Sequence, residues 1–464
     1  MKTFYKVLHR STHLCQGFGG KAKSKARLGE IKTDHGLIKT PAFISAATKG
    51  TIKSLSPQLI KEIGIQAGCV NTYHLVIHPG AEIIEKAGGI YKYGKLEIPL
   101  MSDSGGFQVF SLAKDEKARH RNFLTPLEPP RSREVQSRKK FGISLSQNNT
   151  RTADVRGEEQ PLLVKIYEDG VKFRSTFDGT LIEFTPEKSM EYQRQIGADI
   201  NMAFDECTYY PASHEYTEKA MKRTHKWLIR SIKKFKGLRV KRVDELKNLR
   251  NSQNSQNIFN NQYLYGVIQG GIFENLRKKS AEFVVSQDTP GVAIGGVSVG
   301  ESKKEMRDQV RWVSDYLPKD RPVHLLGVGQ IDDIIDLVKY GVDTFDCVEP
   351  TRLARMGRIY QITRLNSVNK SSLSNFYEKL KNRKNHSASL SGQTDILKSI
   401  YKADLSPVNE NCQCYVCQNF TKSYLHHLFK QREILGYTLA TYHNLWTMEK
   451  LFEKIREMIG NDLI

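Results

Sequence analysis

The fold prediction starts from residues 343–357, Asp343-Thr-Phe-Asp346-Cys-Val-Glu-Pro-Thr-Arg352-Leu-Ala-Arg355-Met-Gly357. A short apolar run carries a carboxylate at its end and is followed by two arginines. This pattern indicates a buried strand that surfaces beside an anion, with Asp346 as a candidate nucleophile and Arg352 and Arg355 as a candidate phosphate clamp. Because an Asp after a strand is often a helix cap or a loop carboxylate, other parts of the chain must support this interpretation.

The same arrangement, an apolar strand followed by polar residues, recurs along the chain. The predicted strands and their polar ends cover 36–47, 67–75, 99–107, 200–207, 263–271, 291–297, 323–329 and 344–346. Apolar residues at helical spacing predict helices at 215–235, 274–286, 302–317 and 331–340. Ser302 and Glu305 have the form of a capping box.

Strands that alternate with single helices predict a parallel sheet covered on both faces. The number of units favours a (β/α)₈ TIM barrel, an α/β fold, over an open doubly wound sheet. In such a barrel the active site lies at the C-terminal ends of the strands. The residues predicted there, each on a different strand, are Asp103, Asp205, Gln269, Gly296 and Asp346.

Three stretches interrupt this scheme and are predicted to be surface insertions, mostly flexible. Two lie in the barrel domain, residues 1–364, at about 114–160 and 238–261, and the third covers about 365–394. Residues 395–464 would form a zinc-binding subdomain and C-terminal helices, including a helical stretch at 419–435.

The chain carries 71 Lys and Arg against 50 Asp and Glu, a net charge of +21 over 464 residues. A polyanion is therefore the expected partner, although composition alone does not identify RNA. No apolar run is long enough for a membrane span, and the N-terminus lacks a signal-peptide hydrophobic region. We expect a cytoplasmic protein that does not bind membranes.

Cys412, Cys414 and Cys417 place three thiols within one short segment. Three thiolates and an imidazole suit tetrahedral Zn²⁺, and four protein ligands would leave no position for water. The sequence therefore predicts a structural zinc ion and no organic cofactor. His443 is a candidate fourth ligand, with His426 and His427 as alternatives.

With these motifs in place, the chain resembles the tRNA-guanine transglycosylase family, also called queuine tRNA-ribosyltransferases, of bacterial type. The resemblance covers most of the sequence outside the insertions. Its motifs are Asn71-Thr-Tyr-His-Leu, Ser102-Asp-Ser-Gly-Gly-Phe-Gln108, Phe204-Asp-Glu-Cys207, Gly266-Val-Ile-Gln-Gly-Gly271, Gly295-Gly296, Leu326-Gly-Val-Gly, Phe345-Asp-Cys-Val-Glu-Pro-Thr-Arg352 and the cysteine motif with His443. It implies an irregular barrel with a zinc subdomain that exchanges the wobble guanine in the anticodon loop of certain tRNAs for a 7-deazaguanine base, in queuosine biosynthesis.

The resemblance also implies roles for individual residues. Asp346 looks like the nucleophile and Asp103 like the general acid/base. The remaining implied roles are purine-edge binding by Asp205 and Gln269, a backbone contact at Gly296, stacking by Phe107 and Leu326, anticodon-loop contacts by Arg352 and Arg355, and zinc ligation by His443.

Two further positions bear on which base is inserted. Cys207 and Val299 resemble family members that use the small base preQ1, whereas members that use queuine tend to have Gly in the loop that carries Val299. We expect a homodimeric enzyme that prefers preQ1. The alternatives are a queuine-inserting member, a non-catalytic tRNA-binding subunit of the same family, against which the retained Asp103 and Asp346 argue, and a barrel glycosidase.

Overall fold

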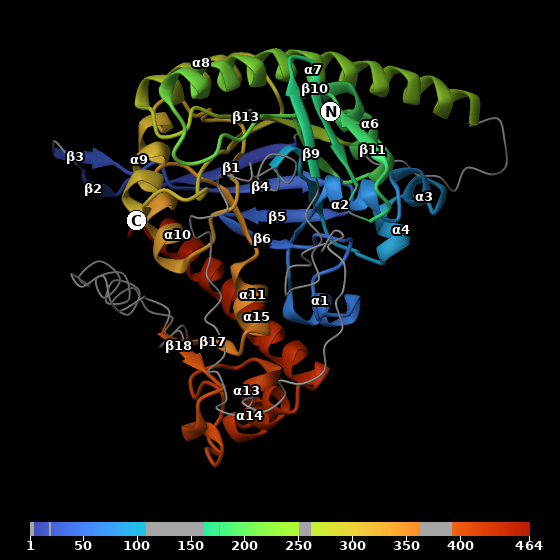
Figure 1. Cartoon of the computed structure of the whole chain (residues 1–464). Coiled ribbons are helices and arrows are strands. Elements are labelled where there is room, and N and C mark those ends of the chain that lie inside the picture. Colours follow the sequence, from blue (N-terminus) through green and yellow to red (C-terminus); the bar gives the residue numbers. More distant parts are fainter. Residues whose placement is uncertain (1–3, 18–19, 108–161, 176, 250–260, 362–391) are drawn as a thin grey trace, which may run out of the picture.

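The computed structural model describes residues 4–17, 20–107, 162–175, 177–249, 261–361 and 392–464. Within them, parallel strands close into an eight-membered barrel (Figure 1). In the order of the chain these strands are β6 (Ala42–Ala46), β7 (Gly68–Val70), β8 (Leu100–Ser102), β12 (Ile200–Met202), β13 (Tyr263–Ile268), β14 (Gly291–Ile294), β15 (Val323–Leu325) and β16 (Thr344–Cys347). β16 pairs with β6 and so completes the ring, which confirms the predicted TIM barrel.

Helices follow the strands and surround the barrel. They are α1 (Pro57–Ile63), α2 (Thr72–Ile77), α3 (Ala81–Lys86), α4 (Ile90–Gly94), α6 (Pro186–Ile196), α7 (His214–Leu249), α8 (Glu274–Ser286), α9 (Lys303–Val313), α10 (Ile331–Val338) and α11 (Glu349–Arg355). The predicted helix 274–286 is confirmed. So is the capping box, in which Ser302 and Glu305 each bond the other's backbone N–H.

Several predicted boundaries are wrong, two of them by a wide margin. The strand expected at 67–75 ends at Val70, because the Asn71 side chain accepts a hydrogen bond from the His74 N–H and caps α2. The helix expected to stop at 235 continues as α7 to Leu249, so the first half of the predicted 238–261 insertion is helical. The insertions expected at 114–160 and at 365–394, apart from the last few residues of the second, lie outside the described residues.

An antiparallel sheet covers the N-terminal end of the barrel. It consists of β1 (Tyr5–Arg10), β4 (Arg27–Thr33) and β5 (Gly36–Thr40), and a hairpin of β2 (Leu14–Gly17) and β3 (Gly20–Lys23) extends from it. Arg27 forms a 2.6 Å ion pair with Asp343, and both side chains are almost fully buried. The Tyr5 hydroxyl donates to the same carboxylate at 2.9 Å. Since removing one partner of a buried pair costs about 3–5 kcal/mol, this contact contributes strongly to holding the sheet on the barrel.

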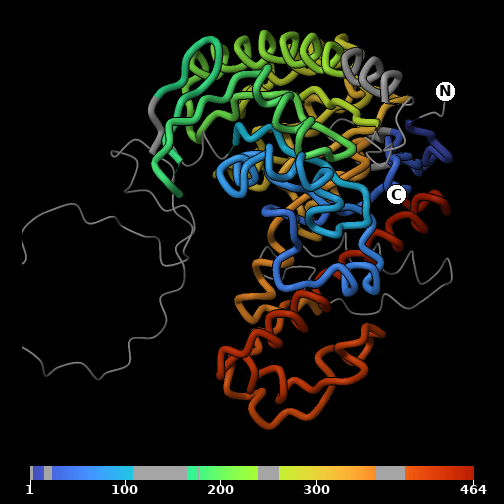
Figure 2. The backbone as a smooth tube through the Cα atoms, turned by 90° about the vertical axis from the view of Figure 1, so that its right-hand side faces the viewer, coloured from blue at the N-terminus to red at the C-terminus, as the bar shows by residue number. Residues whose placement is uncertain are grey.

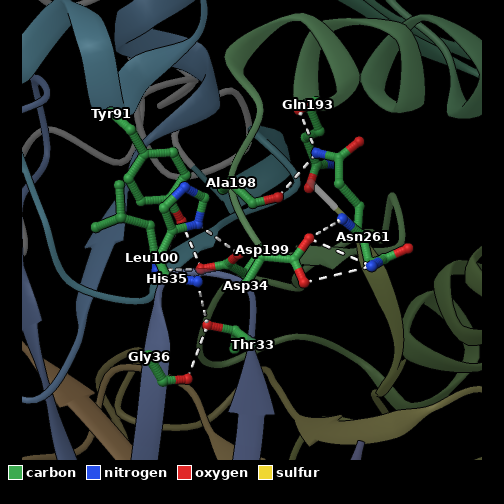
Figure 3. A network of polar contacts seen from close by, with 11 residues as sticks. Thr33, Asp34, His35, Gly36, Tyr91, Leu100, Gln193, Ala198, Asp199 and Asn261 are labelled. Atoms are coloured by element: carbon green, nitrogen blue, oxygen red, sulfur yellow. Dashed lines mark hydrogen bonds and ion pairs between the residues drawn. The ribbon is translucent and has the colours of Figure 1, made fainter. Parts of the chain in front are cut away.

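A second polar network joins the same sheet to the barrel (Figure 3). Asp199, which precedes β12, accepts hydrogen bonds from His35 Nδ1 at 2.8 Å and from the Tyr91 hydroxyl at 2.5 Å. The backbone N–H of Leu100, the first residue of β8, donates to Asp199 at 3.2 Å. Because the network lies where strands begin, away from the end at which barrel enzymes place their active sites, we assign it to stability.

Another antiparallel sheet, β9 (Leu162–Tyr167), β10 (Gly170–Arg174) and β11 (Leu181–Phe184), precedes α6. No prediction from the sequence covers it. Its apolar face buries Val171, Phe173 and Phe184, which cluster with Phe204 and Trp227. The sheet therefore packs beneath the long helix α7, as Figure 1 shows.

The C-terminal part forms a separate lobe below the barrel (Figure 2). It contains β17 (Arg358–Gln361), β18 (Gly392–Asp395), a 3₁₀ turn (Ser399–Tyr401), α13 (Tyr415–Asn419), α14 (Lys422–Lys430) and α15 (Ile434–Gly460). The helix expected at 419–435 is shorter: α14 covers 422–430, and breaks separate it from α13 and from α15. α15 runs from this lobe back along the barrel, where it contacts α1, α11 and β6. In the described part of the chain no helix is long and apolar enough to cross a membrane.

Candidate active site

Three carboxylates meet at the C-terminal ends of the barrel strands. Asp103 follows β8, Asp205 follows β12 and Asp346 lies on β16. Burial is the main cause of the raised pKa of Asp103, and the charges of Asp346 and Asp205 raise it further. The structure therefore brings together three acidic residues that the sequence predicted for one site.

Asp103 is held by donors from a neighbouring strand end. The backbone N–H of Thr72 donates to Oδ1 at 2.9 Å, that of Gly105 donates to the same oxygen at 3.1 Å, and the Asn71 side chain donates to Oδ2. Burial raises the pKa of Asp103 to about 7, although the two backbone N–H groups favour its charged form. A carboxyl group with this pKa can both donate and accept a proton at neutral pH.

Asp205 and Gln269 form a buried polar pair. Gln269 Nε2 donates to Asp205 Oδ2 at 2.7 Å, and the Ser104 hydroxyl donates to Oδ1 at 2.8 Å. Burial raises the pKa of Asp205. Gln269 Oε1 is buried and has no hydrogen-bond partner among the described residues. Buried polar atoms without partners are rare, so this oxygen indicates a place for a ligand with a hydrogen-bond donor.

Gly296 lies beside that amide in the left-handed region, with φ of 61°. A Cβ there would collide with Gln269 Oε1, so only glycine fits. The fully buried Arg277 fixes this turn: it donates to the carbonyl oxygens of Gly295 and Gly296, both at 2.6 Å, and of Gly271 at 2.7 Å. Burial lowers the pKa of Arg277 to about 10, and it stays charged at neutral pH.

Asp346, on β16, has a side chain that is 19% exposed. Its Oδ1 accepts a hydrogen bond from the backbone N–H of Gly327 at 2.9 Å. Its Oδ2 has no hydrogen-bond partner in the part of the chain that the structure describes. One oxygen is thus fixed and the other is available to react.

The other predicted site residues are less closely tied together. Leu326 lies next to Gly295, and Phe107 is 47% exposed at the edge of the described segment. Cys207 is buried beside Asp205, and this environment raises its pKa. Val299 lines a small cavity with Gly296 and other residues: Thr208, Tyr209, Tyr210, Ala212, Thr217, Gly271, Ile272 and Phe273.

Arg352 and Arg355 are on α11, directly after the strand that carries Asp346. Arg352 is exposed, whereas Arg355 is half-buried and donates to the Thr351 carbonyl oxygen at 2.8 Å. Of the two, Arg352 is the better placed to reach an external phosphate.

A buried Cys₃His cluster lies in the C-terminal lobe. One ligand atom each from Cys412, Cys414, Cys417 and His443 lies within 4.8 Å of the others. His443 Nε2 donates to the Tyr360 carbonyl oxygen at 2.9 Å, which leaves Nδ1 directed at the three sulfurs. Such a bond typically orients a metal-binding histidine, so these four residues fit a metal ion.

The two alternative histidines are not part of this cluster. His426 is engaged with the Ile396 carbonyl oxygen at 2.7 Å, and His427 is exposed. Helix α15 carries His443 to the thiols, and this is why a residue well separated in sequence completes the set.

Several residues that shape the site had no predicted role. Asn71, Thr72 and Ser104 orient the carboxylates, and Arg277 fixes the turn at Gly296. His324, on β15, lies 3.2 Å from Asp346. Asn71 and His324 fall within or beside motifs that the sequence displays, but their partners depend on strand register, which the sequence does not state.

Comparison with known proteins decides the family. A family profile described as "Queuine tRNA-ribosyltransferase" matches residues 22–138 and 129–464. The chain belongs to the queuine tRNA-ribosyltransferase family. It is 38% identical over 441 residues to the queuine tRNA-ribosyltransferase of Caldanaerobacter subterraneus subsp. tengcongensis, covering 95% of this chain and 92% of the relative.

Other members of the queuine tRNA-ribosyltransferase family are similarly related. The protein of Aquifex aeolicus is 38% identical over 437 residues, with 94% of this chain and 92% of the relative covered. That of Halothermothrix orenii is 34% identical over 464 residues, with 100% and 95% covered. The resemblance stated from the motifs is confirmed, and the chain is an enzyme of the pentosyltransferase class.

Proposed function

We propose that this protein exchanges a guanine in the anticodon loop of tRNA for a 7-deazaguanine base through a covalent intermediate on Asp346. The observation that supports this most is the arrangement of the carboxylates. Within the described residues Asp346 Oδ2 has no hydrogen-bond partner, and the charge of Asp346 contributes to the raised pKa of Asp103, which is about 7.

In the first step Asp346 Oδ2 attacks C1′ of the ribose. The O–C1′ bond forms as the C1′–N9 bond breaks, and the electron pair leaves with the purine. Asp103 donates a proton to the departing guanine, which makes it a better leaving group. The developing oxocarbenium character is stabilised by carboxylates, as in retaining glycosidases.

The second step reverses the first with another base. Asp103, now ionised, takes a proton from the incoming base, whose nitrogen attacks C1′ and displaces Asp346. The phosphodiester chain is never cut, because only the glycosidic bond is exchanged. A covalent nucleophile divides a difficult exchange into two similar displacements.

The Asp205–Gln269 pair would recognise the purine edge. A carboxylate is an acceptor for the N1–H and the 2-amino group of guanine. Gln269 Oε1, which has no partner in the described part of the chain, and the left-handed turn at Gly296 supply further polar groups where a base would bind. Phe107 and Leu326 would lie on either side of the ring, and Cys207 beneath its edge.

We further propose preQ1 as the preferred base. The cavity at Val299 holds only about 10 Å³, room for about one water molecule. A cyclopentenediol would have to displace Val299, and overfilling a packed site costs roughly 1–3 kcal/mol. A small 7-substituent would fit more readily.

The partner would be tRNA, held by charge. The net charge of +21 and the exposed Arg352 at the mouth of the barrel suit a phosphate chain, with Arg355 in support. Bases of an anticodon loop are already unpaired, so the cost of extracting one into the site is small. An enzyme of tRNA would act in the cytoplasm.

The metal would be zinc, and its role structural. Three thiolates and an imidazole prefer Zn²⁺, and all four positions would be occupied by protein. Bound there, the ion would link the α13 segment to α15 and thereby stabilise the lobe.

We also propose a homodimer that uses the C-terminal lobe. A groove of about 550 Å³ there is lined by Leu405, Tyr424 and the basic residues Lys402 and Lys430. Leu405 is 76% and Tyr424 38% exposed, and exposed apolar side chains that gather in one patch mark interaction surfaces. A second copy is the occupant that the family resemblance suggests.

Incubation with radiolabelled guanine and unmodified tRNA tests the activity. A transglycosylase transfers label into full-length tRNA, a non-catalytic subunit binds tRNA without transfer, and a sugar glycosidase does neither. Absence of label in tRNA, with tRNA binding retained, would contradict the proposal.

A further inference from the structure

His324 is a fully buried histidine at the centre of the barrel. It lies on β15, and its register partner on the next strand is Thr344. His324 Nδ1 is 2.9 Å from the Thr344 hydroxyl oxygen, and Nε2 is 3.2 Å from Asp346 Oδ1. One imidazole therefore links two positions of the strand that carries the reactive carboxylate.

The Nε2 atom has no aligned hydrogen bond among the described residues. Leaving a buried polar group unsatisfied costs about 1–3 kcal/mol, and Asp346 Oδ1 is the acceptor within reach. A small rotation of the Asp346 carboxylate would align the pair. Hydrogen bonds of this kind are often poorly aligned before substrate binds and tighten in the reacting complex.

The partners determine which nitrogen carries the proton. A carboxylate only accepts, so in the neutral imidazole the Nε2 that faces it is the N–H. Nδ1 is then an acceptor, and the Thr344 hydroxyl donates to it. The acceptor-only carboxylate of Asp346 thus places the hydrogen on Nε2, and the Thr344 hydroxyl, which can donate or accept, holds the Nδ1 side of the ring.

We propose that His324 is a positioning residue for the nucleophile. Together with the Gly327 N–H it holds Oδ1 of Asp346, so that Oδ2 is the oxygen that attacks C1′. When the Oδ2–C1′ bond forms and the C1′–N9 electron pair leaves with the purine, Oδ1 becomes the carbonyl oxygen of the ester and keeps both donors. No proton moves to or from the imidazole.

This inference rests on the proposed role of Asp346 and adds a requirement to it. A carboxylate held by the Gly327 N–H alone could rotate about its Cβ–Cγ bond and present either oxygen at a range of angles. A second donor to Oδ1, the Nε2–H of His324 at 3.2 Å, restricts that rotation. Loss of the second donor should therefore lower the rate of the covalent step and change the affinity for tRNA little.

Three variants test the idea. His324→Phe keeps the ring and removes the donor, His324→Asn restores a shorter donor, and Thr344→Val removes the hydroxyl with little change of shape. The measurements are single-turnover formation of the covalent protein–tRNA adduct, kcat and KM for tRNA and guanine, and thermal unfolding of each variant.

We expect His324→Phe to slow adduct formation about 100-fold, the effect of losing a reacting orientation, with KM for tRNA little changed. His324→Asn should recover part of the rate. Thr344→Val should slow the step about tenfold, equivalent to about 1.4 kcal/mol, because the ring loses the hydroxyl that holds its Nδ1 side and can turn away from Asp346.

Adduct formation by His324→Phe at the wild-type rate would overturn the proposal. If that variant does not fold, Thr344→Val decides: an unchanged rate contradicts the role, and a slower one supports it. Asp346→Asn is measured in parallel. If Asp346→Asn retains exchange, the proposed function fails. If Asp346→Asn is inactive but the His324 and Thr344 variants react at the wild-type rate, only the positioning role is refuted.

Discussion

Asp343 and Asp346 lie three residues apart at β16, yet their carboxylates have opposite environments. Asp343 is fully buried in an ion pair with Arg27, whereas one oxygen of Asp346, at the barrel mouth, has no partner among the residues that the structure describes. A strand that crosses the barrel carries the first to the closed end and the second to the open end. The N-terminal end of the barrel thus carries contacts that stabilise the fold, and the C-terminal end carries the candidate catalytic groups, as expected for this fold.

The raised pKa of Asp103 predicts how exchange depends on pH. Guanine departure needs its protonated form and base attack needs its ionised form, so exchange should be fastest near pH 7, where both are populated. Asp103→Asn should lower exchange at least about 100-fold and abolish this pH optimum. The measurement is label incorporation between pH 5 and pH 9.

The same group links pH to stability. Its folded-state pKa of about 7 exceeds the ordinary 3.8, so the folded protein binds the proton more tightly and loses stability as pH rises from about 4 through 7. Asp103→Asn lacks that loss, and its free energy of unfolding relative to wild type should rise by roughly 2–4 kcal/mol over this range. A pH-independent difference would show that Asp103 titrates normally.

Val299 should control the choice of base. In competition on one tRNA, wild type should favour preQ1 over queuine by roughly 10- to 100-fold, because the larger base overfills the cavity. Val299→Gly should narrow that preference, while Val299→Ala serves as an intermediate control. Equal use of both bases by the unmodified protein would disprove the size argument.

Arg352 should contribute one phosphate contact. Arg352→Ala is expected to weaken tRNA binding and to reduce the slope of log K against log salt by about one. Filter binding from low to high salt measures this slope. An unchanged slope would show that Arg352 does not contact a phosphate. Lys278, an exposed lysine on α8 paired with Glu274, provides a control substitution for nonspecific charge.

The Cys₃His cluster should hold a stoichiometric metal that stabilises the C-terminal lobe. Cys412→Ser, or prolonged chelation, should expose the segment around α13 to protease and lower the unfolding temperature. Metal content by mass spectrometry should report one zinc ion per chain in wild type. A metal-free preparation with unchanged melting would contradict a structural zinc.

The barrel could be predicted from the sequence because each of its strands is marked by residues that are adjacent in the chain. Each strand is a short apolar run, and each of Asp103, Asp205, Gln269 and Asp346 follows or ends one, so the known geometry of barrels places them together. The cysteine motif is similarly local. The helix at Thr72 could have been found, since Asn71 is a favourable N-cap, but the apolar residues after it also suit a strand.

What could not be predicted depends on contacts between distant segments. The proximity of His324 to Asp346 depends on the register of β15 against β16. The antiparallel sheet β9–β11 is an exception, because buried Val171 and Phe173 alternate with exposed Lys172 and Arg174 directly after Asp169-Gly170, a pattern from which a strand could have been predicted. Arg277 looks like one more surface cation of α8 until the structure shows it buried among carbonyl oxygens.

The central claim is that Asp346 carries the ribose covalently. The most direct measurement is denaturing gel electrophoresis of the protein with labelled tRNA, in which a covalent adduct migrates as a protein–RNA band. Wild type should form this band and lose it when guanine is added in excess, whereas Asp346→Asn and Asp346→Ala should form none and incorporate no guanine. Guanine incorporation by Asp346→Ala at the wild-type rate would contradict the account.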